Sequence, residues 1–318
     1  MKAASLALAA LLVAGCAGSG VMSHRPGTNP ATRTSIAATS SEGDLQRPRI
    51  DVTNWEDQRT LIPLHLFVPE AARNIGPGSA IVITIPGEGR FGCTANFVWE
   101  ARGRRFLGSA GHCFLPAAAS ATHGPGADYD ASGVVVEVCV EACEGNFRSN
   151  LLLGTWVRLG KVAYARQQNL EGSGVGHDFG VVEIPREFRD YVRAEMPVWR
   201  GPNGVQELHL GDYGCHYGHG LVVGETFLTK ARVGIGGGSD PDAWSGDFAG
   251  AFGDSGSPMV GCVNDGLGFH GTGAVGVITH LGIRLSTSGE HGVIFGTTVR
   301  RAVEMAREAN LRLSLVLP

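Results

Sequence analysis

Short apolar runs separated by glycine and proline constrain the fold of this chain most strongly. They are rich in β-branched residues, and no helical pattern lies between them. Such a succession of strands favours an antiparallel barrel or sandwich. The 48 glycines and the 18% share of charged residues suit many short strands joined by turns. The predicted strands are Ala80 to Pro86, Val134 to Val140, Phe179 to Ile184, Leu221 to Leu228 and Ala274 to His280.

The end of the chain has a different pattern, which predicts one helix. Its apolar residues recur at helical spacing on one side, opposite a charged side. Thr297 or Thr298 could cap this helix, because a threonine hydroxyl can accept a hydrogen bond from a free N–H of the first turn. The apolar side holds Val299, Ala302, Val303 and Ala306, and the charged side holds Arg300, Arg301, Glu304, Arg307 and Glu308.

The first residues have the pattern of an export signal. A positive start, Met1-Lys2, precedes the apolar run from Ala3 to Leu12, which is too short to span a bilayer. Val13-Ala14-Gly15-Cys16 resembles a bacterial lipobox, so we expect residues 1–15 to be removed and Cys16 to carry a lipid. The mature protein would then be anchored in the bacterial cell envelope. The alternative is an ordinary signal peptide, with Cys16 incidental and the protein secreted.

Composition divides the remainder into three parts. Residues 16–49 are rich in small and polar residues and predict a flexible tether. Residues 50–76 contain apolar side chains such as Trp55, and they either pack on the domain or act as a pro-segment. Residues 77–318 form the predicted folded domain. The formal net charge of −4 and the absence of a basic run argue against a nucleic-acid partner.

The segment Gly253-Asp254-Ser255-Gly256-Ser257-Pro258 predicts a tight turn around one serine. Such a turn can expose the Ser255 hydroxyl and aim the N–H groups of Gly253 and Ser255 at one point, where they would stabilise an oxyanion. A serine is a poor nucleophile unless a base activates it and a third group orients that base. His112 in Ser-Ala-Gly-His-Cys is the candidate base, and Asp178, which leads into an apolar run, is the candidate acid.

The order of these three motifs resembles that of the chymotrypsin-like serine peptidases, from about Pro77 to the C-terminus. The tail Gly292 to Val299 is similar to that of the bacterial secreted branch, the streptogrisin and glutamyl endopeptidase types. The resemblance implies two antiparallel six-stranded β-barrels, a C-terminal α-helix, and an active site in the cleft between the barrels. It also implies a serine endopeptidase that acts on polypeptides, and we expect a monomer without a metal or another cofactor.

The resemblance assigns a role to each residue of the motifs. Ser255 would attack the substrate carbonyl, His112 would accept the serine proton, and Asp178 would orient His112. Gly253 and Ser255 would form the oxyanion hole. His177 is expected to be a solvated neighbour of the acid. Asp190, Asp128 and Asp130 are rival acids, but none leads into such an apolar run.

Two further residues have supporting roles by the same resemblance. Asp254 would meet a buried cation that holds the oxyanion turn in shape. In many relatives that cation is a new N-terminus made by activation, and in some bacterial relatives it is an arginine. No convincing activation site is visible here, which leaves an internal arginine as the alternative. Thr279 occupies the place where many relatives carry a serine that bonds the acid.

Cysteine usage supports an exported domain. Apart from Cys16, six cysteines remain, and an even number in an exported chain favours disulfides, although six allow fifteen pairings. The resemblance selects Cys93 with Cys113, and Cys215 with Cys262, the last displaced by one residue from the family position.

Two cysteines and three histidines remain as candidates for metal binding. Cys139 and Cys143 are close enough for a small disulfide loop, and the alternative is a pair of free or metal-binding thiols. His209, His216 and His219 fit no compact zinc spacing. The sequence therefore predicts no metal site.

The specificity pocket is the least constrained part of the prediction. By resemblance its floor residue is Ala249, where trypsin-like members carry an aspartate, so a preference for Lys or Arg is not expected, although Asp247 lies nearby. His280 would line the pocket and could receive an acidic side chain. A moderately apolar pocket is the default. The pocket walls would come from Ala249 to Phe252, Thr279 to Gly282 and the stretch near Gly292.

Two other functions are compatible with parts of the sequence. The same fold could serve as a catalytically silent binding or adhesion module, and a peptide or ester assay would separate that from a peptidase. An α/β-hydrolase esterase would need Gly-x-Ser-x-Gly, with the acid and then the histidine after the serine. The segment around Ser255 has the wrong spacing for that motif, and both partners precede it.

Overall fold

The computed structural model describes most of the chain from Ile75 onward. The predicted signal peptide, the lipidated Cys16, the tether and the extension up to residue 74 therefore lie outside the described residues. So do the predicted strand from Leu221 to Leu228, Cys143, Asp128 and Asp130. The described ranges are 75–116, 121–124, 129, 131–141, 145–146, 151–152, 154–168, 175–220, 230–250, 252–286 and 289–318.

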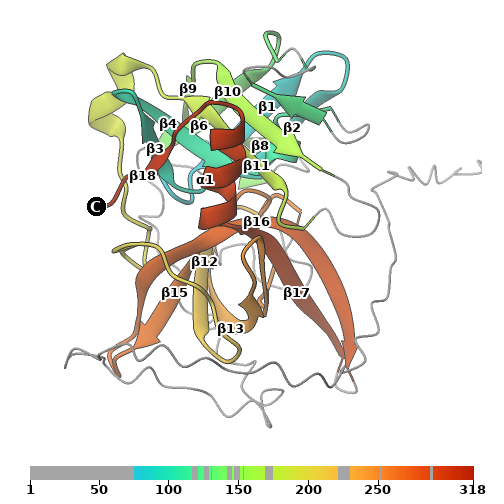
Figure 1. Ribbon diagram of the computed structural model, residues 1–318, viewed down its shortest axis with the longest axis vertical. Coiled ribbons are helices and arrows are strands. Elements are labelled where there is room, and N and C mark those ends of the chain that lie inside the picture. Colours follow the sequence, from blue (N-terminus) through green and yellow to red (C-terminus); the bar gives the residue numbers. More distant parts are fainter. Residues whose placement is uncertain are drawn as a thin grey trace, which may run out of the picture.

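The C-terminal half is a closed antiparallel barrel of six strands in the order β12-β13-β14-β17-β16-β15 (Figure 1). Long β16 and β17 form a hairpin, and β14 pairs with β17 to close the barrel. The strands are β12 Tyr213–Tyr217, β13 Ala231–Ser239, β14 Ala243–Asp247, β15 Pro258–Asn264, β16 Phe269–Ser286 and β17 Gly289–Thr298.

The N-terminal half consists of two larger antiparallel sheets and a short hairpin. One sheet has the order β2-β1-β6-β9, and the other has the order β18-β3-β4-β11-β10-β5. The first contains β1 Ala80–Ile85, β2 Gly89–Thr94, β6 Val135–Glu141 and β9 Thr155–Arg158. The second contains β3 Val98–Ala101, β4 Arg104–Ser109, β5 Ala121–His123, β10 Val162–Gln167, β11 Asp178–Glu183 and β18 Ser314–Leu315. The hairpin pairs β7 Gly145–Asn146 with β8 Leu151–Leu152.

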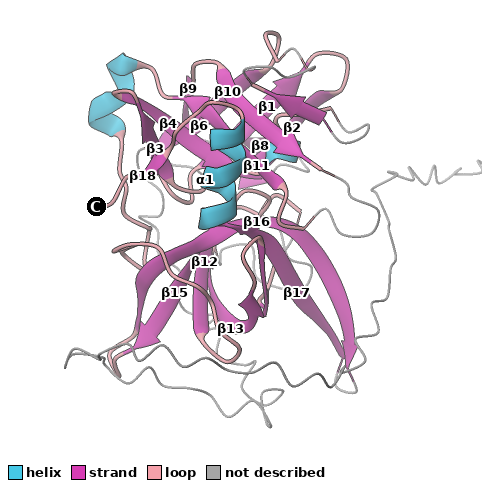
Figure 2. Cartoon of the chain, viewed as in Figure 1, coloured by secondary structure: helices cyan, strands magenta, loops and turns pink. Residues whose placement is uncertain are grey.

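Helices are few among the described residues (Figure 2). Two are short 3₁₀ helices, η3 Gly111–Cys113 and η4 Arg186–Tyr191. The α-helix α1 spans Val299–Glu308, and its N-cap Thr298 accepts a hydrogen bond from the Arg301 N–H at 3.1 Å. None of the described helices is long and apolar enough to cross a membrane.

A shared core joins the two halves. Trp99 and Phe179 of the N-terminal half belong to the same buried cluster as Val260 and Val277 of the barrel and Met305 of α1. Each half also has its own cluster, built on β1, β4 and β6 in one and on β14 to β17 in the other. Because the contact between halves is packed like an interior, residues that it brings together are held at fixed positions.

The predicted architecture is confirmed in its main features. Four of the five predicted strands match β1, β6, β11 and part of β16, and the terminal helix has Thr298 as its cap. The described part of the chain is mainly antiparallel sheet with a C-terminal helix. Among the described residues, hydrogen bonds close the C-terminal half into a barrel. In the N-terminal half the two larger sheets are not joined into a closed barrel by hydrogen bonds.

Candidate active site

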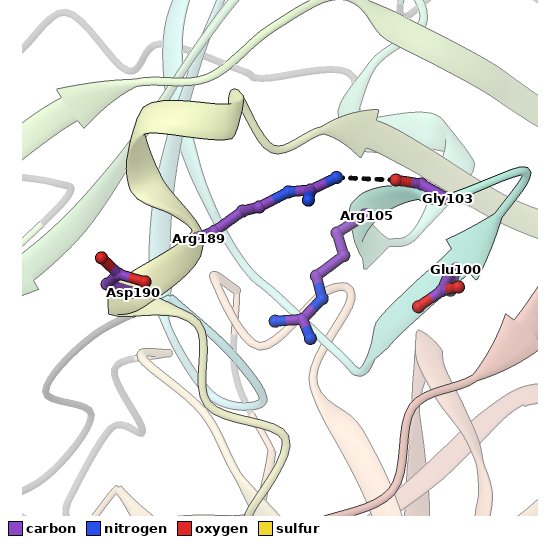
Figure 3. Close-up of a pocket in the computed structure, with 5 residues that line it drawn as sticks. All are labelled: Glu100, Gly103, Arg105, Arg189 and Asp190. Atoms are coloured by element: carbon purple, nitrogen blue, oxygen red, sulfur yellow. Dashed lines mark hydrogen bonds between the residues drawn. The ribbon is translucent and has the colours of Figure 1, made fainter.

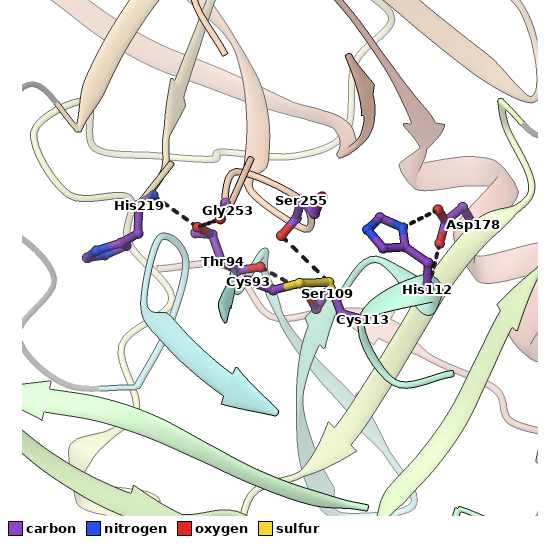
Figure 4. The surroundings of a disulfide bond; sticks show 9 residues. All are labelled: Cys93, Thr94, Ser109, His112, Cys113, Asp178, His219, Gly253 and Ser255. Atoms are coloured by element: carbon purple, nitrogen blue, oxygen red, sulfur yellow. Dashed lines mark hydrogen bonds and ion pairs between the residues drawn. A yellow bond between two sulfur atoms is a disulfide. The ribbon is translucent and has the colours of Figure 1, made fainter. Parts of the chain in front are cut away.

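Strand pairing brings His112 and Asp178 together. Strand β4 runs into η3, which presents His112, and β11 begins at Asp178. Because β4 and β11 pair antiparallel, with Gly180 opposite Ser109, the end of one strand meets the start of the other. Nδ1 of His112 lies 2.6 Å from Oδ2 of Asp178, and the His112 backbone N–H donates to Oδ1 at 2.9 Å (Figure 4).

The two side chains shift each other's protonation. The Asp178 side chain is fully buried, whereas that of His112 is 28% exposed. Burial alone would lower the pKa of His112, but the charge and hydrogen bond of Asp178 outweigh burial and raise this pKa above its ordinary value of 6.5. Burial alone would raise the pKa of Asp178, but His112 outweighs it and the pKa is lowered. Asp178 is therefore ionised at neutral pH and suited to stabilising an imidazolium.

Thr297 fixes the backbone of Asp178 from the other half of the molecule. The buried Thr297 hydroxyl, on β17, donates to the Asp178 carbonyl at 2.9 Å and accepts from the Asp178 N–H at 3.2 Å. Thr297 was predicted only as a possible helix cap and not as a partner of Asp178. Thr279, expected to bond the acid, has other partners: its hydroxyl lies 2.7 Å from Nδ1 of His280 and 3.5 Å from the carbonyl of Phe295.

Ser255 lies on a turn that faces the His112 loop. The Thr94 N–H donates to the Ser255 carbonyl at 2.9 Å, and Sγ of Cys113 lies 3.9 Å from the same oxygen. Figure 4 shows the His112 ring between Asp178 and Ser255. Within the described part of the chain, the Ser255 hydroxyl and His112 Nε2 form no hydrogen bond with each other. Such bonds are often long in unliganded enzymes and tighten with substrate.

Two glycines shape the turn around Ser255. Gly253 and Gly256 have φ values of 106° and 90°, which L side chains rarely adopt. A Cβ at Gly256 would also lie 2.0 Å from the Ser109 hydroxyl and 2.2 Å from the Thr94 carbonyl. Thr94 donates its hydroxyl to the Gly253 carbonyl at 2.8 Å. Among the described residues, the N–H groups of Gly253 and Ser255 have no acceptor, which leaves both available to an oxyanion.

A buried ion pair supports the turn from behind. Nη1 of Arg232 lies 2.5 Å from Oδ2 of Asp254, and the two side chains are 2% and 0% exposed. The other Asp254 oxygen accepts from the Gly220 N–H at 2.7 Å, and Arg232 Nη2 donates to the Gly220 carbonyl. Arg232, on β13, is thus an internal arginine that meets Asp254. Nothing in the sequence around Arg232 distinguishes it from the other arginines.

The disulfides follow the predicted pairing where they are described. Cys93 is bonded to Cys113, and Cys215 to Cys262. Cys139 is also disulfide-bonded, although Cys143 lies outside the described residues. The first bridge ties β2 to the loop that holds His112. A grouping of possible metal ligands within the described ranges joins His112 to Cys93 and Cys113, whose sulfurs are already used in that bridge.

The three histidines that were considered as metal ligands each have a different hydrogen-bond partner. His209 bonds Asp212, His219 Nε2 contacts the Gly78 carbonyl, and His216 Nε2 donates to the Ala249 carbonyl at 2.9 Å. Burial and the neighbouring Arg232 lower the pKa of His216 to about 4, so it is neutral at neutral pH.

Two of the predicted pocket residues, His280 and Ala249, have hydrogen-bonding neighbours in the barrel. Burial lowers the pKa of His280, and Nδ1 of its ring lies 2.7 Å from the Thr279 hydroxyl. Ala249 is half-buried, and its carbonyl accepts the hydrogen bond from His216.

Asp190, a rival for the acid, lies elsewhere. It borders a polar hollow on the N-terminal half with Arg105 and Arg189 (Figure 3). Arg189 donates to the Gly103 carbonyl there at 2.7 Å. Because Asp178 holds both contacts to His112, Asp190 is not its partner.

Comparison with known proteins gives matches by structure alone. No family model matches the chain, and no curated protein matches it by sequence. Thermobifida fusca protease A is 18% identical, with a TM-score of 0.41, and covers 77% of this chain and all of its own. The thermostable serine protease AL20 is 15% identical, with a TM-score of 0.43, over 74% of this chain and 95% of its own.

Cellulomonas bogoriensis chymotrypsin is 16% identical, with a TM-score of 0.40, over 76% of this chain and 99% of its own. These three structures, which are similar to this chain, are chymotrypsin-like serine proteases. The function has to be argued from the site itself.

Proposed function

We propose that this protein is a serine endopeptidase with Ser255 as nucleophile, His112 as general base and Asp178 as the acid that orients it. The observation that carries the proposal is the double contact between His112 and the buried Asp178, beside a glycine turn that holds Ser255. A histidine that only faces solvent does not need two hydrogen bonds to a fully buried carboxylate. Such a pair is suited to accepting and returning a proton.

The reaction divides into two proton-balanced steps. The Ser255 oxygen attacks the carbonyl carbon of the peptide bond, and Nε2 of His112 accepts the hydroxyl proton. The developing oxyanion is held by the N–H groups of Gly253 and Ser255. His112 then gives its proton to the amine that leaves. Water attacks the acyl-enzyme with His112 again as base, which releases the acid product and restores Ser255.

The ion pair between Arg232 and Asp254 supports an oxyanion turn that needs no new N-terminus made by activation. Arg232 supplies the cation that Asp254 meets, so the oxyanion turn does not depend on a cut before Ile75 for its charge partner. The proposal therefore includes a preformed oxyanion hole.

Export is the second part of the proposal. The bridges Cys93–Cys113 and Cys215–Cys262 support an oxidising compartment, because disulfides are rare in reducing cytosol. Lipid attachment at Cys16 remains a prediction, which metabolic labelling of wild-type and Cys16→Ala protein with a fatty acid would test.

The test of the catalytic proposal is Ser255→Ala, assayed on a mixture of peptides. We expect kcat/KM to fall by about 10⁶-fold, because the nucleophile is removed. Thermal unfolding should be nearly unchanged, since Ser255 is partly exposed. Ser314→Ala, an exposed serine on β18, is the control and should keep full activity. Full activity in Ser255→Ala would contradict the proposal, and an inert wild type would favour a silent binding module.

A further inference from the structure

Thr94 connects the N-terminal half to the turn of residues 253–258, which carries Ser255. It is the last residue of β2 and is fully buried. Its backbone N–H donates to the Ser255 carbonyl at 2.9 Å, and its hydroxyl donates to the Gly253 carbonyl at 2.8 Å (Figure 4). One residue therefore holds the turn on both sides of Asp254.

Gly253 is the residue of this turn whose N–H is proposed to bind the oxyanion, and its two peptide groups can rotate. As a glycine with a φ of 106°, it has no side chain to restrict these rotations. Among the described residues its N–H has no acceptor, and its carbonyl accepts only the hydroxyl of Thr94. The bond from Thr94 thus removes one of the two rotations by which the N–H could turn away from the substrate.

The direction of the Thr94 hydroxyl is fixed by a second bond. Its oxygen accepts the His219 N–H at 3.0 Å, which leaves its single proton for the Gly253 carbonyl. The His219 ring is also held, because its Nε2 donates to the Gly78 carbonyl at 3.0 Å. Gly78 donates its own N–H to the carbonyl of Ala95, the residue after Thr94, at 2.9 Å. These bonds form a closed ring that orients the hydroxyl.

The ion pair between Arg232 and Asp254 acts on a different part of the same turn. Arg232 contacts the Asp254 side chain, whereas the Thr94 hydroxyl contacts the main chain of Gly253. The ion pair therefore does not replace the bond to the Gly253 carbonyl.

We propose that Thr94 is a positioning residue, whose hydroxyl keeps the Gly253 N–H directed at the oxyanion. This inference rests on the proposed function. Removing an oxyanion donor typically costs about 10²- to 10³-fold in kcat. A donor that is present but loosely held should cost about 10- to 100-fold, since small misplacements already slow the chemical step. Substrate affinity should change little, because Thr94 is fully buried.

The experiment compares Thr94→Val with the wild type on peptide substrates. Valine keeps the branched shape and removes the hydroxyl, while the backbone bond to Ser255 remains. We expect kcat to fall by about 10- to 100-fold, with KM within about twofold of the wild type. The acid limb of the pH–rate profile should not move, because His112 and Asp178 keep their contacts.

A peptide aldehyde with the sequence of a cleaved peptide gives a second readout. Its carbonyl carbon bonds the Ser255 oxygen, and its own oxygen then lies where the oxyanion of the reaction would lie. The inhibition constant should weaken in Thr94→Val by the same factor as kcat/KM, as expected for an interaction made in the transition state. A purely structural role would lower the amount of active protein and leave the inhibition constant unchanged.

Thr94→Ser and Thr94→Ala form a second pair of variants, which differ from each other by the hydroxyl alone. The serine variant should keep most of the wild-type kcat, and the alanine variant should behave as Thr94→Val does. This pair keeps the test valid if the valine variant folds poorly.

Thr298→Val is the matched control. The buried Thr298 hydroxyl donates to the Pro241 carbonyl at 2.8 Å and accepts the Arg301 N–H at 3.1 Å, which is the bonding pattern of the Thr94 hydroxyl. This variant should lose a similar amount of stability and retain the wild-type kcat and inhibition constant.

A wild-type kcat and inhibition constant in Thr94→Val, or an equal loss of kcat in Thr298→Val, would overturn the inference and leave the peptidase proposal standing. A wild type that cuts none of the peptides would contradict the proposed function itself.

Discussion

At the scale of single residues, the proposed chemistry depends on the contact between His112 and Asp178. The raised pKa of His112 follows from a charge and a hydrogen bond that outweigh burial. His112 must be neutral to accept a proton, so activity should fall as the pH drops through its pKa. The acid limb of the pH–rate profile should therefore have its midpoint above 6.5.

Asp178→Asn tests this assignment. Without the aspartate charge, burial remains as the main influence and lowers the pKa of His112, so the acid limb should move to lower pH. We also expect kcat to fall by about 10⁴-fold, because the amide no longer selects the required tautomer. The readout is kcat/KM against pH. Asp190→Asn is the control and should leave the profile unchanged, whereas an unshifted limb in Asp178→Asn would remove Asp178 from the mechanism.

The sequence predicted the residues that lie within recognisable motifs. His112, Asp178 and Ser255 each sit in a short local pattern, and the structure places the first two in contact. Arg232 and Thr297 were not predicted in these roles. Each comes from a strand distant in sequence from its partner, and its role arises only when β13 and β17 are placed in the barrel. Their importance is a property of tertiary packing, which local patterns do not contain.

At the scale of elements, the serine turn depends on glycine at two positions. Gly256→Ala should destabilise the protein by several kcal/mol, because the new methyl group would meet backbone and hydroxyl oxygens at a φ of 90°. Activity should be lost in the fraction that folds. Chemical denaturation and peptide hydrolysis check both expectations.

Gly204→Ala is the control for that variant. A Cβ at Gly204 meets nothing within 4 Å, and its φ is not in the positive range. Its stability should stay within about 0.5 kcal/mol of the wild type. If both substitutions behave alike, the close packing of the turn is not what holds Ser255.

Element prediction succeeded where local signals are strong. Apolar runs bounded by glycine and proline identified β1, β6 and β11, and helical spacing identified α1 with its threonine cap. It could not set the full length of β16, because that strand runs through a bulge between Ile278 and His280 that alternation does not reveal. Within this bulge the Thr279 hydroxyl lies beside Nδ1 of His280.

At the scale of the whole molecule, the C-terminus ties the two halves together. Helix α1 packs into the core shared by both halves, and the chain then continues to β18, which pairs with β3 (Figure 1). Leu313 is buried and belongs to this shared core. A strand of two residues has no sequence signature, so this connection was not predicted.

Deleting residues 313–318 should therefore weaken the contact between the halves. We expect a loss of about 2–5 kcal/mol of stability, similar to removing a large buried side chain, and lower activity because the halves position His112 and Ser255 relative to each other. Deleting only residues 317–318, which are exposed, should have little effect. Equal stability in the two truncations would show that β18 does not stabilise the molecule.

The most direct test of the central claim is labelling with a fluorophosphonate, which reacts with a serine only when a base and an oxyanion hole activate it. We expect one label per molecule, located at Ser255 by peptide mapping, and almost none in His112→Ala or after unfolding. Labelling at another residue, or equal labelling of wild type and His112→Ala, would contradict the claim that His112 activates Ser255.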